Sequence, residues 1–445
     1  MNSRLLIGNG ILITRDPKQP WFEDGAVYIE GKHIKAVGRT SDLKCQHPDA
    51  QYLDAGGKLI MPGYINAHHH AYSAFARGMA IEGNHPKHFL EILEGTWWKL
   101  DNHLTLKATY DSGIATFLSC IQNGVTTVID HHASYKATRG SLTELSKAAE
   151  LTGIRACLSY EISDRNGREK MIEAVEETFE FIDNTLTRKD GMLKSMVGLH
   201  ASFTLPDDVL ALCKQKNTSG AGYHIHVAEG VYDQEFTQEH FGSSVVERLT
   251  HLGILSQNSI AGHCIHISET DMDLLKQSQT TVVHNPQSNM ANAVGAPDVL
   301  TMMDKGILVC LGTDGYTNDM LESAKNAMIL QRHKHQNPDR GFLEASKMLF
   351  ENNSILASKI FDETLGVLKP GAAADVIIVD YKPFTPLNQN NIDGHMIFGV
   401  SGQNTDTTIV NGKLLMQNKR ILIDDEALFK ACIATSKEVW RNLNE

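Results

Sequence analysis

The sequence predicts an α/β fold, in which a (β/α)8 TIM barrel carries a small β-sandwich domain formed from the N- and C-terminal segments. Eight short apolar runs alternate with helix-length amphipathic segments through the middle of the chain, as expected for parallel strands with helical crossovers. Strand-like alternation of apolar and polar residues marks both ends. The length of 445 residues, 42% of them hydrophobic, suits one large barrel with a satellite domain.

The two ends of the chain are expected to pair with each other. "GAVYIEGKHIKAVG" alternates around a central Glu-Gly-Lys turn as a hairpin does, and "TTIVNGKLLMQ" carries an Asn-Gly pair typical of a type I′ turn. We therefore expect residues 1–58 and 366–445 to form the composite β-sandwich domain. Residues 59–365 would then be the catalytic barrel.

The eight runs of the middle region each end in polar residues. They are "LIMPGYINAHHH", "TTVIDHH", "IRACLSYEI", "MVGLHAS", "GYHIHVAE", "SIAGHCIH", "TTVVHNP" and "ILVCLGTDG". In a closed parallel barrel all carboxyl ends lie on one face, so these polar residues would converge there. The alternative is an open doubly wound sheet, which normally brings a Gly-rich phosphate-binding fingerprint after its first strand. The sequence has no such fingerprint.

The composition of the chain limits the classes of molecule that we expect it to bind. A net charge of -12, with no basic stripe, argues against nucleic acid as a partner. No apolar run is long enough to span a bilayer, and the first residues lack the features of a leader, so we expect a cytoplasmic protein that binds no membrane. The seven cysteines are scattered and never form a CxxC pair, which is typical of reduced core residues.

A metal site is predicted at the first strand end. Side chains of a strand alternate between two faces, so His68 and His70 point together into the barrel mouth and His69 points to the opposite side. Two imidazoles spaced in this way can chelate a metal, and His226 and Asp314 are the best candidates to complete the ligand set. His224 shares a face with His226 but should lie one layer deeper.

Catalytic and substrate-binding residues are predicted around this metal. Glu229, just past the strand that carries His226, is placed for general acid and base work, and His263 and Asp314 form a second proton-transfer set. The tryptophan pair of "GTWWKLD" would belong to a lid or, alternatively, to the packing at a helix start. The residues expected to contact substrate are His200, His284, Asn285, Trp97, Trp98, Arg165, Tyr72 and His132, with Glu161 and His131 as weaker candidates.

The order of "MPGYINAHHH", "GLHASFTLP", "HIHVAE", "AGHCIHIS", "VVHNPQSNM", "LGTDG" and "LGVLKPGAAADVIIVD" resembles the amidohydrolase superfamily. Within it, the chain is similar to the ATZ/TRZ-like branch of aminohydrolases and chlorohydrolases. The segments "LEGTWWKLDNHLT", "IDHHAS" and "DRNG" are most similar to the SsnA-type aminohydrolases, which are associated with purine catabolism.

The resemblance implies one divalent metal, usually zinc, with iron or manganese as alternatives. It assigns ligand roles to His68, His70, His226 and Asp314, and places His263 close to the attacking water. The fourth run has no lysine at its end that could bridge two metals, so the resemblance implies a mononuclear site. A homodimer is the family expectation.

The expected activity is that of a hydrolase of carbon–nitrogen bonds of the cyclic amidine deaminase type, acting through metal-activated hydroxide on an amino-substituted nitrogen heterocycle such as a purine. Asp314 and His263 would deprotonate the water, and Glu229 would protonate a ring nitrogen. The alternatives are a hydrolytic dehalogenase, a cyclic amidohydrolase and a non-enzymatic metal-binding protein. The last is disfavoured because it would not need Glu229 and His263 beside complete ligands.

Overall fold

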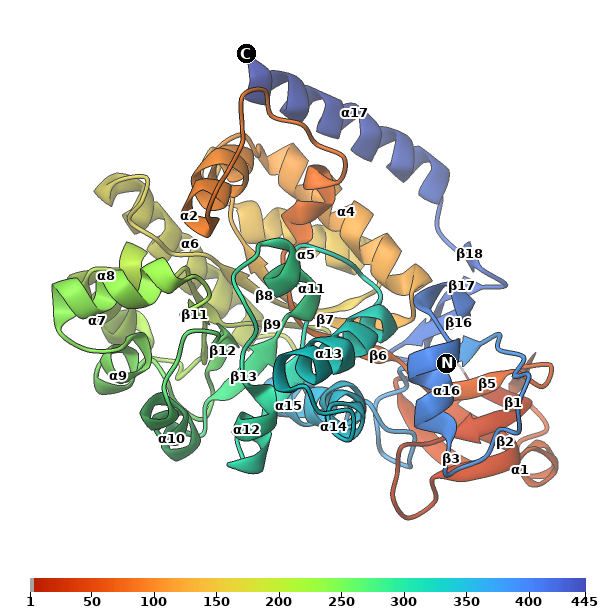
Figure 1. The fold of residues 1–445 in the computed structure, drawn as a ribbon. Coiled ribbons are helices and arrows are strands. Elements are labelled where there is room, and N and C mark those ends of the chain that lie inside the picture. The colour runs from red at the N-terminus through yellow and green to blue at the C-terminus, as the bar shows by residue number, and fades with distance from the viewer. Residues whose placement is uncertain (1–3) are drawn as a thin grey trace.

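The structure, a computed structural model, describes residues 4–445, and a ring of parallel strands occupies its centre (Figure 1). The predicted runs form these strands, and a further short strand, β9, lies just before the fourth run, separated from β10 by Met196. The strands are β6 (Tyr64–His69), β7 (Val125–His132), β8 (Arg155–Tyr160), β9 (Leu193–Ser195), β10 (Val197–Leu199), β11 (Tyr223–Val227), β12 (Ile260–His263), β13 (Thr281–His284) and β14 (Val309–Leu311).

Two parallel sheets of the described chain meet at two seams. Their strand orders are β6-β7-β8-β9 and β10-β11-β12-β13-β14. At one seam Leu199 of β10 forms an isolated parallel bridge with Ile162, just beyond β8. At the other, His69 of β6 bridges Asp314, whose backbone N–H donates to the His68 carbonyl at 3.0 Å. These bonds bring the first and last strands together, as the TIM-barrel fold requires.

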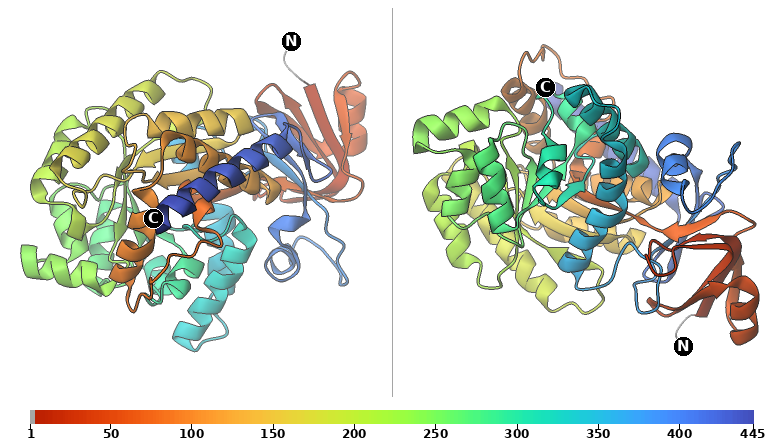
Figure 2. Two further views of the ribbon diagram at one scale, coloured as in Figure 1. Left: turned by 90° about the horizontal axis from the view of Figure 1, so that it is seen from above. Right: turned by 60° about the horizontal axis from the view of Figure 1, so that its bottom comes forward.

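Amphipathic helices surround the strands (Figure 2). Some of them begin at a side-chain cap: Thr105 caps the helix that begins at Leu106, and Ser268 and Asp271 form a capping box. These helices are α4 (Leu106–Gln122), α5 (Ser141–Thr152), α6 (Arg168–Leu186), α7 (Asp207–Lys216), α8 (Val231–Phe241), α9 (Val245–His251), α10 (Glu269–Ser278), α11 (Pro286–Ala291), α12 (Val299–Asp304), α13 (Met320–His335), α14 (Phe342–Lys347) and α15 (Asn353–Phe361).

Both ends of the chain contribute strands to a separate sheet, seen at the lower right of Figure 1. Both predicted hairpins are present, and Asn411 and Gly412 take the positive φ values that a type I′ turn requires. The strands are β1 (Arg4–Ile13), β2 (Trp21–Glu30), β3 (His33–Arg39), β4 (Gln51–Asp54), β5 (Leu59–Pro62), β15 (Val376–Val379), β16 (Thr405–Val410), β17 (Lys413–Gln417) and β18 (Arg420–Ile421).

Details of these end segments differ from the sequence expectation. Strand β5 lies just beyond residue 58 and still pairs with β1 and β15, and residues 40–46 form a short helix, α1 (Thr40–Gln46). Two further helices, α16 (Ile392–Gly399) and α17 (Asp425–Asn444), lie in the C-terminal segment. The exact domain boundaries therefore stay a prediction. None of the helices in residues 4–445 combines the length and the apolarity needed to cross a membrane.

The segment between β6 and α4 forms a lid over the carboxyl ends of the strands. It contains the 3-10 helix η1 (Ala71–Ala76), then α2 (Phe89–Ile92), the π-helix η2 (Leu93–Trp97) and α3 (Trp98–Asp101). Helix α17 runs across the barrel beside this segment (Figures 1 and 2), and its Trp440 indole N–H donates to the Phe75 carbonyl at 2.6 Å. The C-terminal helix therefore fastens the start of the lid.

Candidate metal centre and active site

Four side chains meet where β6, β11 and β14 end. The Nε2 atom of His70 lies 3.3 Å from Nε2 of His226 and 3.2 Å from Oδ1 of Asp314. Nε2 of His68 is buried and has no hydrogen-bond partner within residues 4–445. Ligand atoms of one tetrahedral metal ion lie at such separations, because each sits about 2.0–2.2 Å from the ion. Ligand atoms of His68, His70 and Asp314 lie within 4.8 Å of one another, and so do those of His68, His226 and His263, so this cluster can hold a divalent metal.

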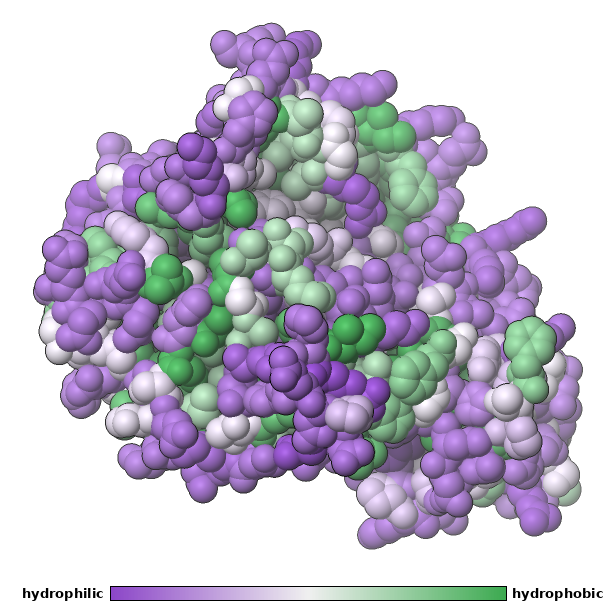
Figure 3. Space-filling model, in the orientation of Figure 1, coloured by the Kyte–Doolittle hydropathy of each residue, from purple (hydrophilic) through white to green (hydrophobic). Residues whose placement is uncertain are grey.

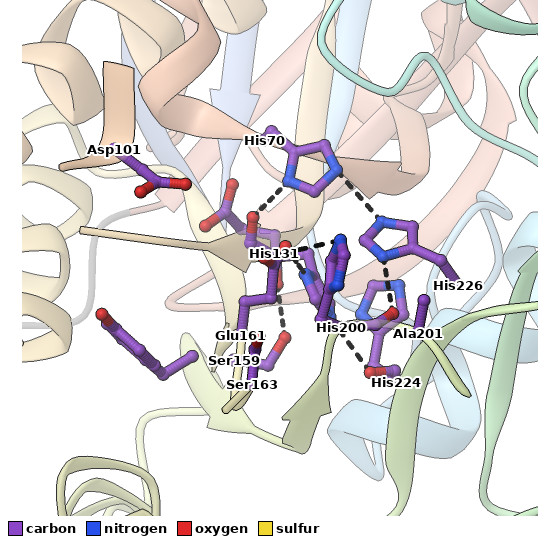
Figure 4. A network of polar contacts seen from close by, with 12 residues as sticks. His70, Asp101, His131, Ser159, Glu161, Ser163, His200, Ala201, His224 and His226 are labelled. Atoms are coloured by element: carbon purple, nitrogen blue, oxygen red, sulfur yellow. Dashed lines mark hydrogen bonds and ion pairs between the residues drawn. The ribbon is translucent and has the colours of Figure 1, made fainter. Parts of the chain in front are cut away.

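The other ring nitrogen of each histidine is held by the protein. Nδ1 of His68 lies 2.7 Å from Nε2 of His224, which sits behind it. Nδ1 of His70 donates to the His131 carbonyl at 2.5 Å, and Nδ1 of His226 donates to the His200 carbonyl at 2.9 Å (Figure 4). Such bonds fix the tautomer and the orientation of a metal-ligating histidine.

Electrostatics suit these ligand roles. Burial lowers the pKa of His68, His70 and His226, so the three imidazoles are neutral and can donate a lone pair. Burial alone would raise the pKa of Asp314, but His70 and His263 lower it overall, so that Asp314 is a carboxylate. Neutral imidazoles and a carboxylate are the forms that bind a divalent cation.

His69 lies on the opposite side of β6, as strand alternation predicts. Its Nδ1 lies 3.0 Å from the Thr313 hydroxyl, at the seam between β6 and β14. Burial lowers the pKa of His69 to about 3. His69 is therefore a neutral packing residue of the barrel wall.

Glu229 and His263 flank the metal ligands. Nε2 of His263 lies 3.5 Å from Oε2 of Glu229 and 3.5 Å from Oδ2 of Asp314. Burial, together with the Asp314 carboxylate, raises the pKa of Glu229 well above its usual range. Asn289 holds Nδ1 of His263 at 2.8 Å. Glu229 is thus a largely buried carboxyl group, with its side chain 12% exposed, that can deliver a proton.

Left-handed backbone is concentrated at this centre. Ala228, His263, Cys264 and Asp314 have φ values of 45°, 69°, 51° and 53°, which L-residues seldom adopt. Ala228 lies between His226 and Glu229, so this turn redirects the chain between a ligand and the acid. Such strain is common at functional sites and is retained where the surroundings impose it.

A cavity opens above the centre, and Figure 3 shows apolar side chains around a hollow between the lid and the barrel loops. Phe89 packs closely on Gly230, where an added Cβ atom would lie 2.8 Å from its ring, and Trp97 lies beside Gly315, where an added Cβ atom would lie 3.3 Å from its ring. Of the residues predicted from the sequence, the wall includes His70, Tyr72, Trp97, Trp98, His200, His226, Glu229 and Asp314.

Four residues expected to contact substrate lie elsewhere. His284 and Asn285 are fully buried, and His132 is buried behind Tyr72, with ring centroids 5.9 Å apart. Arg165 lies behind Trp98, where it pairs with Asp101 at 2.6 Å. None of the four reaches the cavity wall as the described residues form it, because other side chains stand in front of them.

Sequence reasoning missed part of the wall. Phe89 and Leu93 come from the lid, and their spacing of four residues is a helical apolar pattern that could have indicated them. Phe203 and Tyr232 follow β10 and β11, at the loops where barrel enzymes build their sites. No sequence pattern indicates Asn292 as a lining residue, because its place in the wall depends on the turn after α11.

The chain belongs to the amidohydrolase family, which residues 59–415 match. Residues 25–50 also match the imidazolonepropionase-like composite domain of bacteria. This membership agrees with the His-rich centre at the carboxyl ends of the barrel strands.

Individual relatives cover almost the whole chain. The "5'-deoxyadenosine deaminase" of Methanosarcina acetivorans is 32% identical over 429 residues, 95% of each chain. The structure of a zinc-bound adenosine deaminase from Xanthomonas campestris superposes with a TM-score of 0.85 at 20% identity, over 99% of this chain and 98% of that one. Atrazine chlorohydrolase TrzN from Arthrobacter aurescens TC1 gives a TM-score of 0.82 at 21% identity, over 98% and 100%. At these identities the two structures show the fold alone.

Proposed function

We propose that this chain is a metal-dependent aminohydrolase that releases ammonia from an amino-substituted purine-type ring. The observation that carries the proposal is the meeting of His68, His70, His226 and Asp314, with the protonated Glu229 beside them at the floor of one cavity. Zinc is the metal we propose, because imidazole nitrogens with one carboxylate oxygen form a common zinc ligand set.

The name of the relative from Methanosarcina acetivorans supports the choice of a purine-type ring, since that protein is described as a deaminase of 5'-deoxyadenosine. The cavity agrees with an uncharged planar ring. Aromatic residues stand along its wall, and no lysine or arginine of the described residues lines it. A nucleobase or nucleoside therefore suits it better than a phosphorylated nucleotide, which would need a cationic partner.

A bound divalent metal would supply a lowered pKa for the attacking water and stabilise developing negative charge. Asp314 and His263, 3.5 Å apart, are placed to take the proton from the attacking water. Glu229, kept protonated by burial, donates its proton to the ring nitrogen next to the carbon under attack. Asp314 then passes a proton to the amino group, which leaves as ammonia. The exocyclic C–N bond breaks, the new hydroxyl group on the ring carbon returns its proton to Glu229, and the ring keeps the oxygen as a carbonyl.

A further part of the proposal concerns the setting of the enzyme. We propose a cytoplasmic homodimer with a role in purine catabolism, as the resemblance of the sequence implies. Size-exclusion chromatography with light scattering would test the dimer directly: a mass of about 49.2 kDa would instead indicate a monomer.

The activity is tested with metal-replete protein and a panel of aminopurines, their nucleosides and nucleotides, aminopterins, s-triazines and chloro analogues. Ammonia and chloride release are followed side by side. We expect ammonia from a purine base or nucleoside, abolished by a chelator and restored by zinc. Chloride without ammonia would indicate a hydrolytic dehalogenase instead. Equal rates with nucleosides and their phosphates would contradict the argument from a wall without lysine or arginine.

A further inference from the structure

A buried ion-pair network connects the lid to the barrel beside the active cavity. The Arg165 guanidinium donates to both carboxylate oxygens of Asp101, at 2.6 and 3.3 Å, and lies 3.5 Å from Oε1 of Glu161. The side chains of Arg165 and Asp101 are 4% and 1% exposed. Asp101 ends α3 of the lid, whereas Glu161 directly follows barrel strand β8.

Arg165 and Glu161 connect the network to the cavity wall, of which Glu161 is itself a part. The guanidinium lies over the Trp98 ring, 5.0 Å from its centroid, and over the Tyr135 ring at 4.5 Å. Trp98 meets His200 edge to face, with ring centroids 5.9 Å apart. Glu161 faces Nδ1 of His131 at 3.4 Å and Nε2 of His200 at 4.0 Å, the group drawn in Figure 4. Arg165 thus touches both the lid tryptophan and the carboxylate that faces the wall histidine.

Burial of these charges has an unfavourable desolvation free energy, so the network is a poor way to hold the lid to the barrel unless their relative position matters. Burying an arginine and two carboxylates removes them from water, and a buried ion pair often adds little net stability. Such a pair fixes the relative orientation of its two groups, because the planar guanidinium group binds both oxygens of a carboxylate in one arrangement. Arg165 does not line the cavity, because it lies behind Trp98 and directs Nη1 and Nη2 at Asp101, so we assign it no direct role in binding.

We propose that Arg165 is a positioning residue that locks the lid over the active cavity, by pairing Asp101 of the lid with Glu161 of the barrel and by seating Trp98 against His200. The substrate-binding wall is then complete only while this pair is formed. The effect on substrate binding rests on the proposed function, whereas the locking of the lid does not.

The test compares Asp101→Asn and Arg165→Lys with a control, all as metal-replete full-length protein. Asparagine keeps the size of Asp101 and removes its charge, and lysine keeps the charge of Arg165 and removes the fork. The matched control is Arg155→Lys, since Arg155 forms a buried two-bond pair with Asp375, at 3.1 and 3.2 Å, at the opposite end of β8. Melting temperature and metal content identify any variant that has simply lost its fold.

Trypsin cleavage at the exposed lid residues Lys87 and Lys99 reports the state of the lid without any substrate. We expect both lid variants to be cleaved there about tenfold faster than wild type, with full metal content, and Arg155→Lys to be cleaved at the wild-type rate. Unchanged cleavage in folded Asp101→Asn and Arg165→Lys would overturn the proposal.

Kinetics with the best ring substrate give the second readout. We expect KM to rise about tenfold in both lid variants, with a smaller change in kcat, because the wall contributes to binding more than to the chemical step. A raised KM in Arg165→Lys with wild-type values in Asp101→Asn would show direct contact with substrate and would overturn the positioning role. If wild type turns over no ring at all, the proposed function fails, while the trypsin rates still decide whether the lid is locked.

Discussion

At the scale of single residues, the ability of the centre to bind a metal depends on which nitrogen of each imidazole has no protein partner. His68, His70 and His226 each give Nδ1 to a protein partner, so Nε2 is the atom that faces the ligand position. Two of these partners are backbone carbonyls, which no side-chain substitution removes. The ligand set is therefore oriented by the barrel itself.

Replacement of a ligand and replacement of the acid should have different effects. We expect His70→Ala and Asp314→Ala to lose metal together with activity, because each removes a donor atom of the set. Glu229→Gln should keep its metal and lose about 10²–10⁴-fold in kcat, since only the proton donor is removed. Metal analysis by mass spectrometry alongside steady-state kinetics measures both effects.

His69→Ala is the matched control for these variants, because His69 neighbours two ligands but faces Thr313. We expect metal content close to one ion per chain in this variant. A full metal complement in His70→Ala, or an empty site in His69→Ala, would contradict the ligand assignment.

His132 makes stability depend on pH. Burial lowers its pKa to about 3 in the folded protein, against about 6.5 in an unfolded chain. Between these values only the unfolded state binds the proton, so the free energy of unfolding falls as pH falls below 6.5, by about 1.4 kcal/mol per unit. Urea denaturation of zinc-saturated protein from pH 7 to 5 should show a flatter decline in His132→Gln than in wild type. Identical slopes would be inconsistent with a neutral buried His132.

At the scale of elements, the strands of the barrel approach one another closely at the seam between β6 and β14. A Cβ atom on Gly312 would lie 2.9 Å from the His68 carbonyl oxygen and 2.4 Å from Oδ1 of Asn285. Gly262 in β12 is different, because its nearest neighbour would be 3.6 Å away. Of these two positions, only Gly312 is one where the closure of the barrel requires glycine.

We therefore expect substitution by alanine to affect stability and metal occupancy differently at Gly312 and at Gly262. Gly312→Ala should lower the free energy of unfolding by about 1–3 kcal/mol and reduce metal occupancy, since the added methyl group displaces the segment that carries His68. Gly262→Ala should change both quantities little. The melting temperature and the metal content of the two variants test this expectation. Equal values for Gly312→Ala and Gly262→Ala would mean that the seam is not tightly packed.

At the scale of the whole molecule, the metal centre joins distant parts of the chain. The donors that we propose come from the ends of β6, β11 and β14, and the segment after β14 meets β6 through the His68 carbonyl. A ligand that binds only the folded state stabilises all of these connections together.

Removal of the metal should therefore destabilise the entire barrel. At free zinc one hundred times its Kd, the expected contribution is about 2.7 kcal/mol, which a chelator would abolish and added zinc restore. Differential scanning calorimetry of the holoenzyme, with and without chelator, measures the shift. Because helix α17 packs on the barrel, its unfolding should follow the same transition; a melting temperature that does not respond to the chelator would contradict a metal site at the barrel centre.

Sequence reasoning predicted the barrel correctly and led to the ligand set that we propose, because both depend on local regularities. Strand periodicity separates His69 from His68 and His70, and parallel strands that end on one face bring His226 and Asp314 to them. These conclusions need no knowledge of loop conformation. Strand alternation and strand polarity alone therefore determine the fold class and the ligand set that we propose.

Tertiary structure decided what lies beyond the strand ends, where side chains no longer alternate. The left-handed turn at Ala228 sets the direction of Glu229, and the lid conceals Arg165 behind Trp98. His132, His284 and Asn285 share the predicted barrel end, yet neighbouring side chains separate them from the cavity. The physical reason is that loop backbone and side-chain depth are fixed by contacts between segments distant in sequence, which no local pattern encodes.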